Sequence, residues 1–265
     1  FLTSSKDTRV YFENYVKKCK NNGLKVYLIE YTRDEKLKKE IKNLTQQLQK
    51  FLQKEGIHPD VIETHDWEGA SLFLEELKIP YVVRAHGCYR ILKKYFGYKA
   101  SLGVEVIETE ALKKASHLIC VSKNSQRMYE ETFGNKGTII TNGVTSTTQN
   151  ISETLPFSLF FFGSVTAKKG FEIALNVFKR ILQKFPTATL HIVGKNYENY
   201  LKENNLGEQK NVINYGHLQG EELKITLQKA GVFIFPSQGE TFGLALCEAM
   251  EIGKAIVAAD IPSFR

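Results

Sequence analysis

Short apolar runs alternate with longer amphipathic segments in the first half of the chain. The short runs are rich in β-branched and aromatic residues and are bounded by polar residues, glycine or proline, a pattern typical of strands. They read LKVYLIEY, DVIET, YVVRA, HLICVS and TIITN. Residues 10–21 and 34–55 instead have helical spacing and outer faces rich in Lys and Glu. Strand and helix in alternation predict a parallel sheet covered on both faces.

A polar stretch rich in Ser and Thr, VTSTTQNISETLP, interrupts this alternation. It has no apolar periodicity and is therefore interpreted as a linker. Beyond it the sequence predicts helices over 169–184, 220–230 and 240–252, between the strands FSLFFFG, ATLHIVG, VINYG, VFIFPS and AIVAAD. We expect an α/β protein with two Rossmann-like domains, residues 1–145 and 157–265, joined by a linker at 146–156.

Composition and charge narrow the class of protein without selecting one. The 265 residues are 42% hydrophobic and 25% charged, as in ordinary globular proteins. The net charge of +7 suits phosphate-rich ligands or an anionic membrane surface. No sequence signature supports nucleic-acid binding, and no Gly-x-Gly-x-x-Gly follows the early strands, which argues against a nicotinamide-dependent dehydrogenase. The four cysteines lie far apart without zinc or redox spacing, and no Asp-x-Asp motif occurs, so we expect free thiols and no metal.

The two ends of the sequence suggest an incomplete chain. FLTSS resembles the end of a buried strand, and the chain stops after the strand and loop AIVAADIPSFR. We therefore expect truncation at both ends. No apolar run approaches the roughly 20 residues that cross a bilayer, and no signal peptide opens the sequence. A cytoplasmic location is the expectation.

The helix expected after the linker begins with two cations. Its apolar stripe consists of Phe171, Ala174, Leu175, Phe178, Ile181 and Leu182. Lys168 and Lys169 lie at its N-terminus, where positive charge opposes the helix dipole. The two lysines either lie there by chance and face solvent, or they form a site for an anion. Their position alone leaves both interpretations open.

The stretch FPSQGETFGLALCEAM combines a strand end, a turn and a helix start. Ligands of open α/β sheets lie beyond the carboxyl ends of the strands, and backbone N–H groups at a helix start can hold a phosphate. Glu240 and Glu248 would repel a bare phosphate, but they can accept hydrogen bonds from the hydroxyls of an attached sugar and a ribose. Two acids eight residues apart also arise by chance, so the spacing alone favours a solvated helix residue for Glu248.

Several motifs together resemble the family-4 retaining glycosyltransferases, which have the GT-B fold. SQGETFGLALCEAMEIGKAIVAADIPS is similar to the family's Glu-x7-Glu signature. The other similar motifs are FFFGSVTAKKGFEIAL, LHIVG, VINYGHL, LICVSKNS and IITNGV, which cover nearly the whole chain. The resemblance implies two Rossmann-like domains whose parallel sheets face each other across a cleft.

By this resemblance the second domain binds a nucleoside diphosphate sugar. Glu240 would contact the donor sugar, Glu248 the ribose, and Lys169 the diphosphate, which also explains the lysine at a helix start. The donor-binding set is Gly163, Ser164, Lys169, Gly216, His217, Glu240, Thr241, Phe242, Gly243, Leu244 and Glu248. The implied reaction transfers a hexosyl unit to an acceptor hydroxyl with retention and without a metal or other cofactor, in glycan, polysaccharide or glycolipid synthesis.

Two departures from the family pattern motivate a second hypothesis. Ser164 occupies a position where the family commonly has arginine, and KDTRVYFENY replaces a Gly-Gly loop, with Arg9 as a substitute cation. The alternative function is a nucleotide-sugar-binding pseudo-enzyme of the same fold.

In the first domain the resemblance assigns the acceptor and a histidine near the reacting sugar. His86 matches that histidine and is the third candidate catalytic residue, beside Glu240 and Lys169. For His65 and Asp66 a structural role is favoured. The run YRILKKYFGYKAS mixes aromatic and basic residues, which suits an anionic membrane carrying a lipid-linked acceptor. A solvated helix that packs its aromatic residues inward is the favoured alternative.

Overall fold

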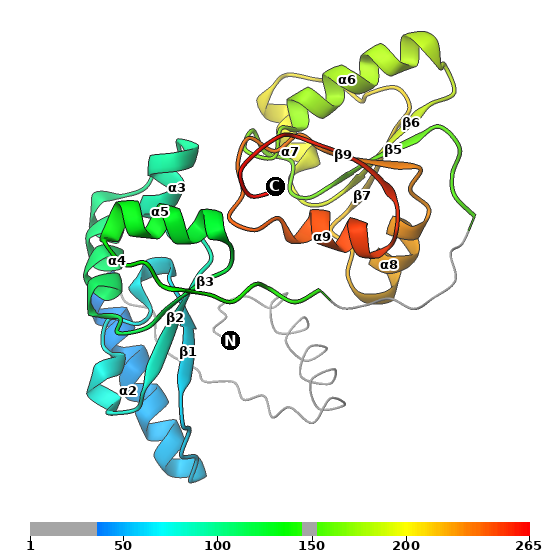
Figure 1. Ribbon diagram of the computed structural model, residues 1–265. Helices are drawn as coiled ribbons and strands as arrows, with labels where there is room; N and C mark the ends of the chain where they lie inside the picture. Colours follow the sequence, from blue (N-terminus) through cyan, green and yellow to red (C-terminus); the bar gives the residue numbers. More distant parts are fainter. Residues whose placement is uncertain (1–35, 145–152) are drawn as a thin grey trace. The chain divides into compact units, whose positions relative to one another are not determined.

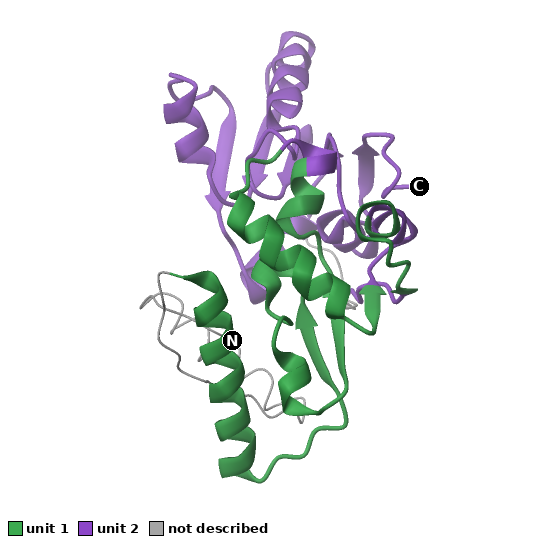
Figure 2. Ribbon diagram, turned by 90° about the vertical axis from the view of Figure 1, so that its left-hand side faces the viewer, with its two compact units in different colours: residues 1–93, 98–119, 129–138 green, residues 94–97, 120–128, 139–265 purple. Residues whose placement is uncertain are grey.

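The alternation of strands and helices expected from the sequence is present in the computed structural model, which describes residues 36–144 and 153–265 (Figure 1). The predicted strand LKVYLIEY, the predicted helix over 10–21, Arg9 and most of the predicted linker lie outside these residues. The chain divides into two compact units. Unit 1 comprises residues 1–93, 98–119 and 129–138, and unit 2 comprises 94–97, 120–128 and 139–265 (Figure 2).

Unit 1 is built on a four-stranded sheet in the order β1-β2-β3-β4. β1 and β2 pair in parallel, with Ile62 opposite Tyr81. The strands are β1 (Ile62–His65), β2 (Tyr81–Ala85), β3 (Leu118–Cys120) and β4 (Thr138–Ile139), and the α-helices are α2 (Leu37–Glu55), α3 (Tyr89–Phe96), α4 (Leu102–Lys114) and α5 (Lys123–Phe133). Two 3-10 helices, η1 (Trp67–Gly69) and η2 (Leu74–Leu77), lie between β1 and β2. Four of the predicted strands are thereby confirmed, β2 with the predicted limits and the other three with limits that differ by one to three residues.

Unit 2 contains a five-stranded sheet in the order β7-β6-β5-β8-β9, and each neighbouring pair is parallel. The chain runs outward from the central β5 to β7 and then returns to the other side of β5 with β8. The strands are β5 (Ser158–Phe162), β6 (Thr189–Val193), β7 (Val212–Gly216), β8 (Val232–Phe235) and β9 (Ala255–Ala258). The point where the strand order reverses lies between β5 and β8, which is where ligands of such sheets bind.

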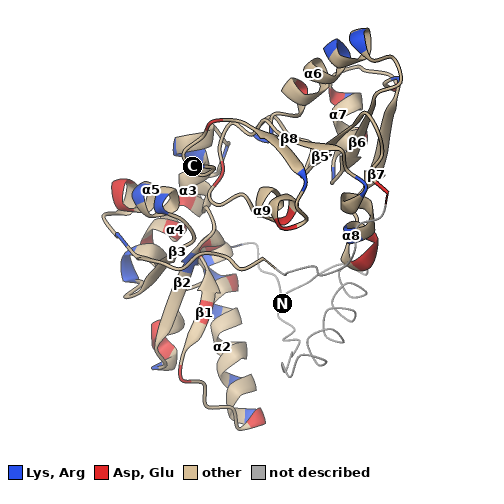
Figure 3. Cartoon of the chain, turned by 45° about the vertical axis from the view of Figure 1, so that its right-hand side comes forward, with Lys and Arg blue, Asp and Glu red and all other residues tan. Residues whose placement is uncertain are grey.

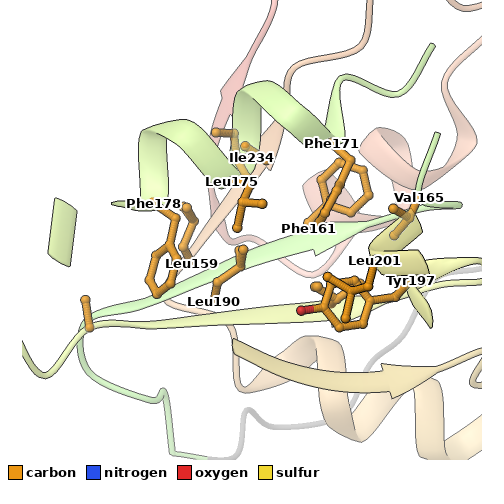
Figure 4. Close-up of a cluster of buried hydrophobic side chains, with 13 residues drawn as sticks. Leu159, Phe161, Val165, Phe171, Leu175, Phe178, Leu190, Tyr197, Leu201 and Ile234 are labelled. Atoms are coloured by element: carbon orange, nitrogen blue, oxygen red, sulfur yellow. The ribbon is translucent and has the colours of Figure 1, made fainter. Parts of the chain in front are cut away.

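Helices cover both faces of the unit 2 sheet, as its nearly continuous apolar strands require. α6 (Phe171–Lys184) and α7 (Tyr197–Glu203) lie on one face, and α8 (Gly220–Gln228) and α9 (Leu244–Glu251) on the other (Figure 1). The predicted stripe of α6 is confirmed, because its first four residues are buried against the strands and its last two are partly buried there. Figure 4 shows Phe171 and Phe178 of α6 directed at the strands.

Two helices begin later than the sequence pattern predicts. The helix expected from residue 169 starts at Phe171, after Gly170 with φ 69°, and the helix expected from residue 240 starts at Leu244, after Gly243 with φ 96°. Both glycines have left-handed backbone conformations, which end the preceding loop and cannot continue a helix. Lys169 and Glu240 therefore lie in loops. The sequence analysis also missed the short helix α7.

Charged residues of both signs occur in both units (Figure 3). No helix in residues 36–144 and 153–265 is long and apolar enough to cross a membrane. In the same residues Cys88, Cys120 and Cys247 are free thiols, the first two buried, as expected. Cys19 lies outside the described residues.

A buried histidine on β6 makes the stability of unit 2 sensitive to acid. His191 is 2% exposed, stacks on Phe160, and has its two ring nitrogens within hydrogen-bond distance of Thr189 and Tyr215. Burial lowers the pKa of His191 to about 4 from an ordinary value of 6.5. Between these two pH values the unfolded chain binds a proton that the folded chain does not, so stability falls as the pH drops through this range.

We expect this histidine to cost about 2 kcal/mol of unfolding free energy between pH 7 and pH 5. Urea unfolding at both pH values measures the loss, and the His191→Gln variant should show a smaller loss than the wild-type chain. His58→Gln, at an exposed histidine, is the control and should leave the difference unchanged. An identical acid loss in the His191→Gln variant would refute the assignment.

Candidate functional site

The loops that follow β5 and β8 place the predicted donor-site residues at the reversal point of the unit 2 sheet. Gly163 and Ser164 follow β5 directly, and the segment from Pro236 to Gly243 connects β8 to α9. The backbone N–H of Gln238 donates to the carbonyl of Lys168, at 2.8 Å. This hydrogen bond joins the loop before α6 to the loop after β8.

Lys169 and Glu240 form an ion pair at this junction. The Lys169 Nζ lies 2.5 Å from Glu240 Oε1, and the Ser237 hydroxyl donates to the same oxygen at 3.0 Å. The carboxylate is buried, whereas the lysine side chain is 27% exposed. The structure thus brings together two predicted catalytic residues from loops 71 positions apart. It also adds Ser237, which the sequence analysis did not identify.

Gly170 allows the loop before α6 and the loop after β8 to lie close to each other. A Cβ atom on Gly170 would lie 2.0 Å from the carbonyl oxygen of Pro236, a distance that real atoms do not reach. Its φ of 69° is also a conformation that residues with side chains rarely adopt. The glycine beside the lysine is therefore required for the contact between Lys169 and Glu240.

The second lysine, Lys168, differs from Lys169 in its surroundings. Burial lowers the pKa of Lys168, and the charge of Glu240 opposes this shift. The Lys168 ammonium lies over the Phe96 ring, 4.4 Å from its centroid. Both lysines at the start of α6 are therefore partly enclosed, and their role as a site for an anion stays a prediction.

A pocket of about 330 Å³ lies at the carboxyl ends of β5, β6 and β7. Its lining includes the predicted Gly163, Ser164 and His217 together with Gly194 and Lys195. A Cβ atom on Gly194 would lie 1.9 Å from the Gly163 carbonyl oxygen, so backbone groups line this pocket where two strand ends approach closely. Gly216, with φ 66°, ends β7 just before His217.

Lys195 is a pocket cation that the sequence analysis missed. It lies two positions after the end of β6, in the same pocket as Ser164, which occupies the position where arginine was expected. Burial lowers the pKa of His217, and the charge of Lys195 lowers it further. Only the position of Lys195 at a strand end could have indicated its role, because isolated lysines are common in this sequence.

The remaining donor candidates lie at the start of α9 and in its body. Thr241 and Phe242 precede the N-cap Gly243, Leu244 is the first helical residue and is 46% exposed, and Glu248 is half-buried. Burial raises the pKa of Glu248, with no other cause of comparable size. The carboxylate of Glu248 is therefore poorly solvated and would gain from hydroxyl donors.

Phe264 closes the space beside Gly243. A Cβ atom on Gly243 would lie 2.6 Å from the Phe264 ring. The ring lines a cavity of only about 10 Å³ together with Lys169, Glu240 and Ser237. That volume holds about one water molecule, so a sugar at Glu240 requires the ring or its loop to move. No motif in the sequence indicated this residue.

In unit 1, the end of β1 holds the loop that follows β2. The Asp66 carboxylate accepts hydrogen bonds from the backbone N–H groups of His86, Gly87 and Cys88, at 3.0, 3.1 and 2.7 Å. The buried hydroxyl of Tyr129 donates to the same carboxylate. These contacts are structural, the role that the sequence analysis favoured for Asp66.

His86 itself presents an exposed side chain on this fixed loop. Desolvation by neighbouring atoms lowers the pKa of His86, and the charge of Asp66 opposes the shift. The neutral imidazole can donate one hydrogen bond and accept another. His65 accepts a hydrogen bond from the backbone N–H of Trp67, which is a local contact.

The run from Tyr89 to Lys99 contains α3, and three of its four aromatic side chains are partly covered. Tyr89, Tyr95 and Phe96 are half-buried, whereas Tyr98, Lys93, Lys94 and Lys99 are exposed. Lys93 pairs with Glu105 at 2.6 Å. The partial burial of three aromatic residues agrees with the favoured alternative for those three only, and contact with a membrane stays a prediction.

Comparisons with known proteins agree with the motifs. The family model Glycosyltransferase Family 4 matches residues 6–147, and the model Glycosyl transferases group 1 matches residues 145–265. The "Uncharacterized glycosyltransferase MJ1178" of Methanocaldococcus jannaschii is 26% identical over 215 residues, 80% of this chain and 58% of that protein. The glycogen synthase of Mycobacterium tuberculosis is 26% identical over 221 residues, 77% of this chain and 52% of that protein.

Among solved structures, Anabaena HepE in complex with UDP and glucose superposes with a TM-score of 0.68 at 20% identity. The match covers 94% of this chain and 71% of HepE. The structural match shows the fold, which is the predicted two-domain α/β fold of GT-B type. The chain spans a little over half the length of these two curated relatives.

Proposed function

Because the chain belongs to Glycosyltransferase Family 4, we propose that it transfers a hexosyl unit from a nucleoside diphosphate sugar to an acceptor hydroxyl, with retention at the anomeric carbon. The ion pair between Lys169 and Glu240 carries this proposal, because it places a cation and a carboxylate at the reversal point of the sheet. The acceptor is a sugar or a lipid-linked sugar, in polysaccharide, glycan or glycolipid synthesis.

Lys169 and Glu240 have separate roles in this reaction. The Lys169 ammonium neutralises the charge that grows on the departing diphosphate, and such charge stabilisation is usually a large part of catalysis. Glu240 accepts hydrogen bonds from hydroxyl groups of the donor sugar. In the unliganded chain the two groups pair with each other, so donor binding replaces this contact by contacts with phosphate and hydroxyl groups.

The glycine-lined pocket suits the nucleotide. Backbone groups at Gly163 and Ser164 can approach the diphosphate closely, and Lys195 supplies the second cation in place of the expected arginine. His217, which lines this pocket, would contact the base. Glu248 lies on α9, outside this lining, and would accept hydrogen bonds from the ribose hydroxyls. With Lys169 and Lys195 as the charge-stabilising groups, we assign the reaction no metal or other cofactor.

The first test is ligand-dependent thermal stability. UDP, GDP, ADP and their sugars are each added in excess, and a ligand at 100 times its Kd adds about 2.7 kcal/mol of stability. We expect one base to stabilise the chain selectively, and UDP is tried first because HepE was solved with UDP. The Lys169→Met variant should lose most of this effect.

The outcome separates the two hypotheses. Stabilisation by a nucleotide sugar together with transfer by the complete protein supports the enzyme. Stabilisation without hydrolysis or transfer across a broad acceptor panel supports the pseudo-enzyme that Ser164 suggested. No stabilisation by any nucleotide contradicts both.

A further inference from the structure

Glu108 is a fully buried carboxylate that the proposed chemistry does not use. It lies on α4 and is 0% exposed. Its Oε1 accepts hydrogen bonds from the backbone N–H groups of Glu68 and Tyr89, at 3.0 and 3.2 Å, and its Oε2 accepts from Arg90, at 3.2 Å. Glu68 follows β1, whereas Tyr89 and Arg90 open α3 after β2. One carboxylate thus joins the loops that follow two neighbouring strands.

Burying the Glu108 carboxylate costs free energy, which its hydrogen bonds must offset. Burial raises the pKa of Glu108, and only the three backbone N–H groups oppose that shift. A well-packed apolar side chain often stabilises a core as well as a buried charge does. Glu105, one turn earlier on α4, shows the ordinary alternative, because it pairs with the half-exposed ammonium of Lys93.

The N–H groups held by Glu108 continue a series that begins at His86. Asp66 holds the N–H groups of residues 86–88, and Glu108 holds those of residues 89–90. Five consecutive backbone N–H groups are therefore bound to two buried carboxylates, while the His86 imidazole is left exposed. A fixed backbone beneath an accessible side chain is the arrangement by which proteins preorganise a reacting group.

We infer that Glu108 is a positioning residue that fixes the backbone carrying His86 and so directs the His86 imidazole. The inference rests on the proposed function, because the direction of the imidazole matters for catalysis only if His86 faces the reacting sugar. Glu108 acts through His86 and touches no substrate. It connects α4, which carries no other candidate residue, to the loop that carries His86.

The first test needs no enzyme activity. Glu108→Gln keeps the size of the side chain but replaces one acceptor oxygen by an NH₂ group that faces a backbone N–H. We expect amide hydrogen exchange at Glu68, Tyr89 and Arg90 to accelerate at least about 10-fold and the His86 ring resonance to shift in NMR spectra. Glu105→Gln, on the same helix, should change neither. An unmoved His86 resonance overturns the inference, whatever the activity.

The second test uses the complete protein and a double-mutant cycle. Glu108→Gln should lower kcat by about 10- to 100-fold through misplacement of His86, with the donor KM within about twofold of wild type. In a His86→Ala background the same substitution should have no further effect on kcat, because the two residues act as one unit. An equal loss with and without His86 overturns the positioning role. If Glu108→Gln gives the expected NMR result but the wild-type protein transfers no sugar, only the proposed function is refuted.

Discussion

Glu240→Gln is expected to reduce sugar transfer by about 10³-fold or more, at the upper end of single-group electrostatic effects. The amide keeps an oxygen for Ser237 and Lys169 but loses the charge that orders the donor hydroxyls and holds Lys169. Initial rates of transfer by the complete protein, with saturating donor, measure the effect. Donor binding should weaken less than kcat falls, because the pocket proposed for the nucleotide, at Gly163 and Lys195, does not include Glu240 in its lining.

The structure gives a reason to use glutamine rather than alanine. Alanine would leave the Lys169 ammonium and the buried Ser237 hydroxyl without the oxygen that both contact. An unsatisfied buried group costs about 1–3 kcal/mol, so Glu240→Ala should lose both activity and stability. Glu221→Gln, at an exposed glutamate on α8, is the control and should retain full activity. Wild-type turnover in the Glu240→Gln variant would contradict the proposed role.

The strands and helices that were predicted well are those whose sequence pattern follows directly from burial of one face or from residues that end a strand. β2 and β7 were predicted to the residue, because their apolar and aromatic runs are bounded by residues that end strands. The stripe of α6 was predicted because a helix that covers a sheet must bury one face. Helix starts were predicted less well, because the left-handed conformations of Gly170 and Gly243 depend on contacts with distant segments.

The site was predictable only where a motif identified it. Lys169 and Glu240 lie in recognisable motifs, and the structure brings them into contact. Lys195, Ser237 and Phe264 were missed because a single lysine, serine or phenylalanine acquires a role only from the loops folded around it. Glu108 was missed for the same reason, since a glutamate on a helix is ordinarily expected to face water.

Gly170→Ala adds one methyl group and is expected to lower the free energy of unfolding by about 3 kcal/mol. The left-handed conformation costs about 1–2 kcal/mol for a residue with a Cβ, and overpacking adds about 1–3 kcal/mol. Because the new methyl would overlap the Pro236 carbonyl, the loop after β8 must move away from α6. The contact between Lys169 and Glu240 should open, and nucleotide-dependent stabilisation should fall with it.

A second glycine separates the two causes of this loss. Gly253 has φ +74°, close to that of Gly170, but nothing lies within 4 Å of a Cβ built on it. Gly253→Ala should therefore show only the cost of the left-handed conformation, about 1–2 kcal/mol, and should keep full nucleotide binding. Urea unfolding and nucleotide titration of both variants measure the difference. Equal losses of stability with unchanged binding would mean that the close approach of Gly170 to Pro236 does not hold together the loops that carry Lys169 and Glu240.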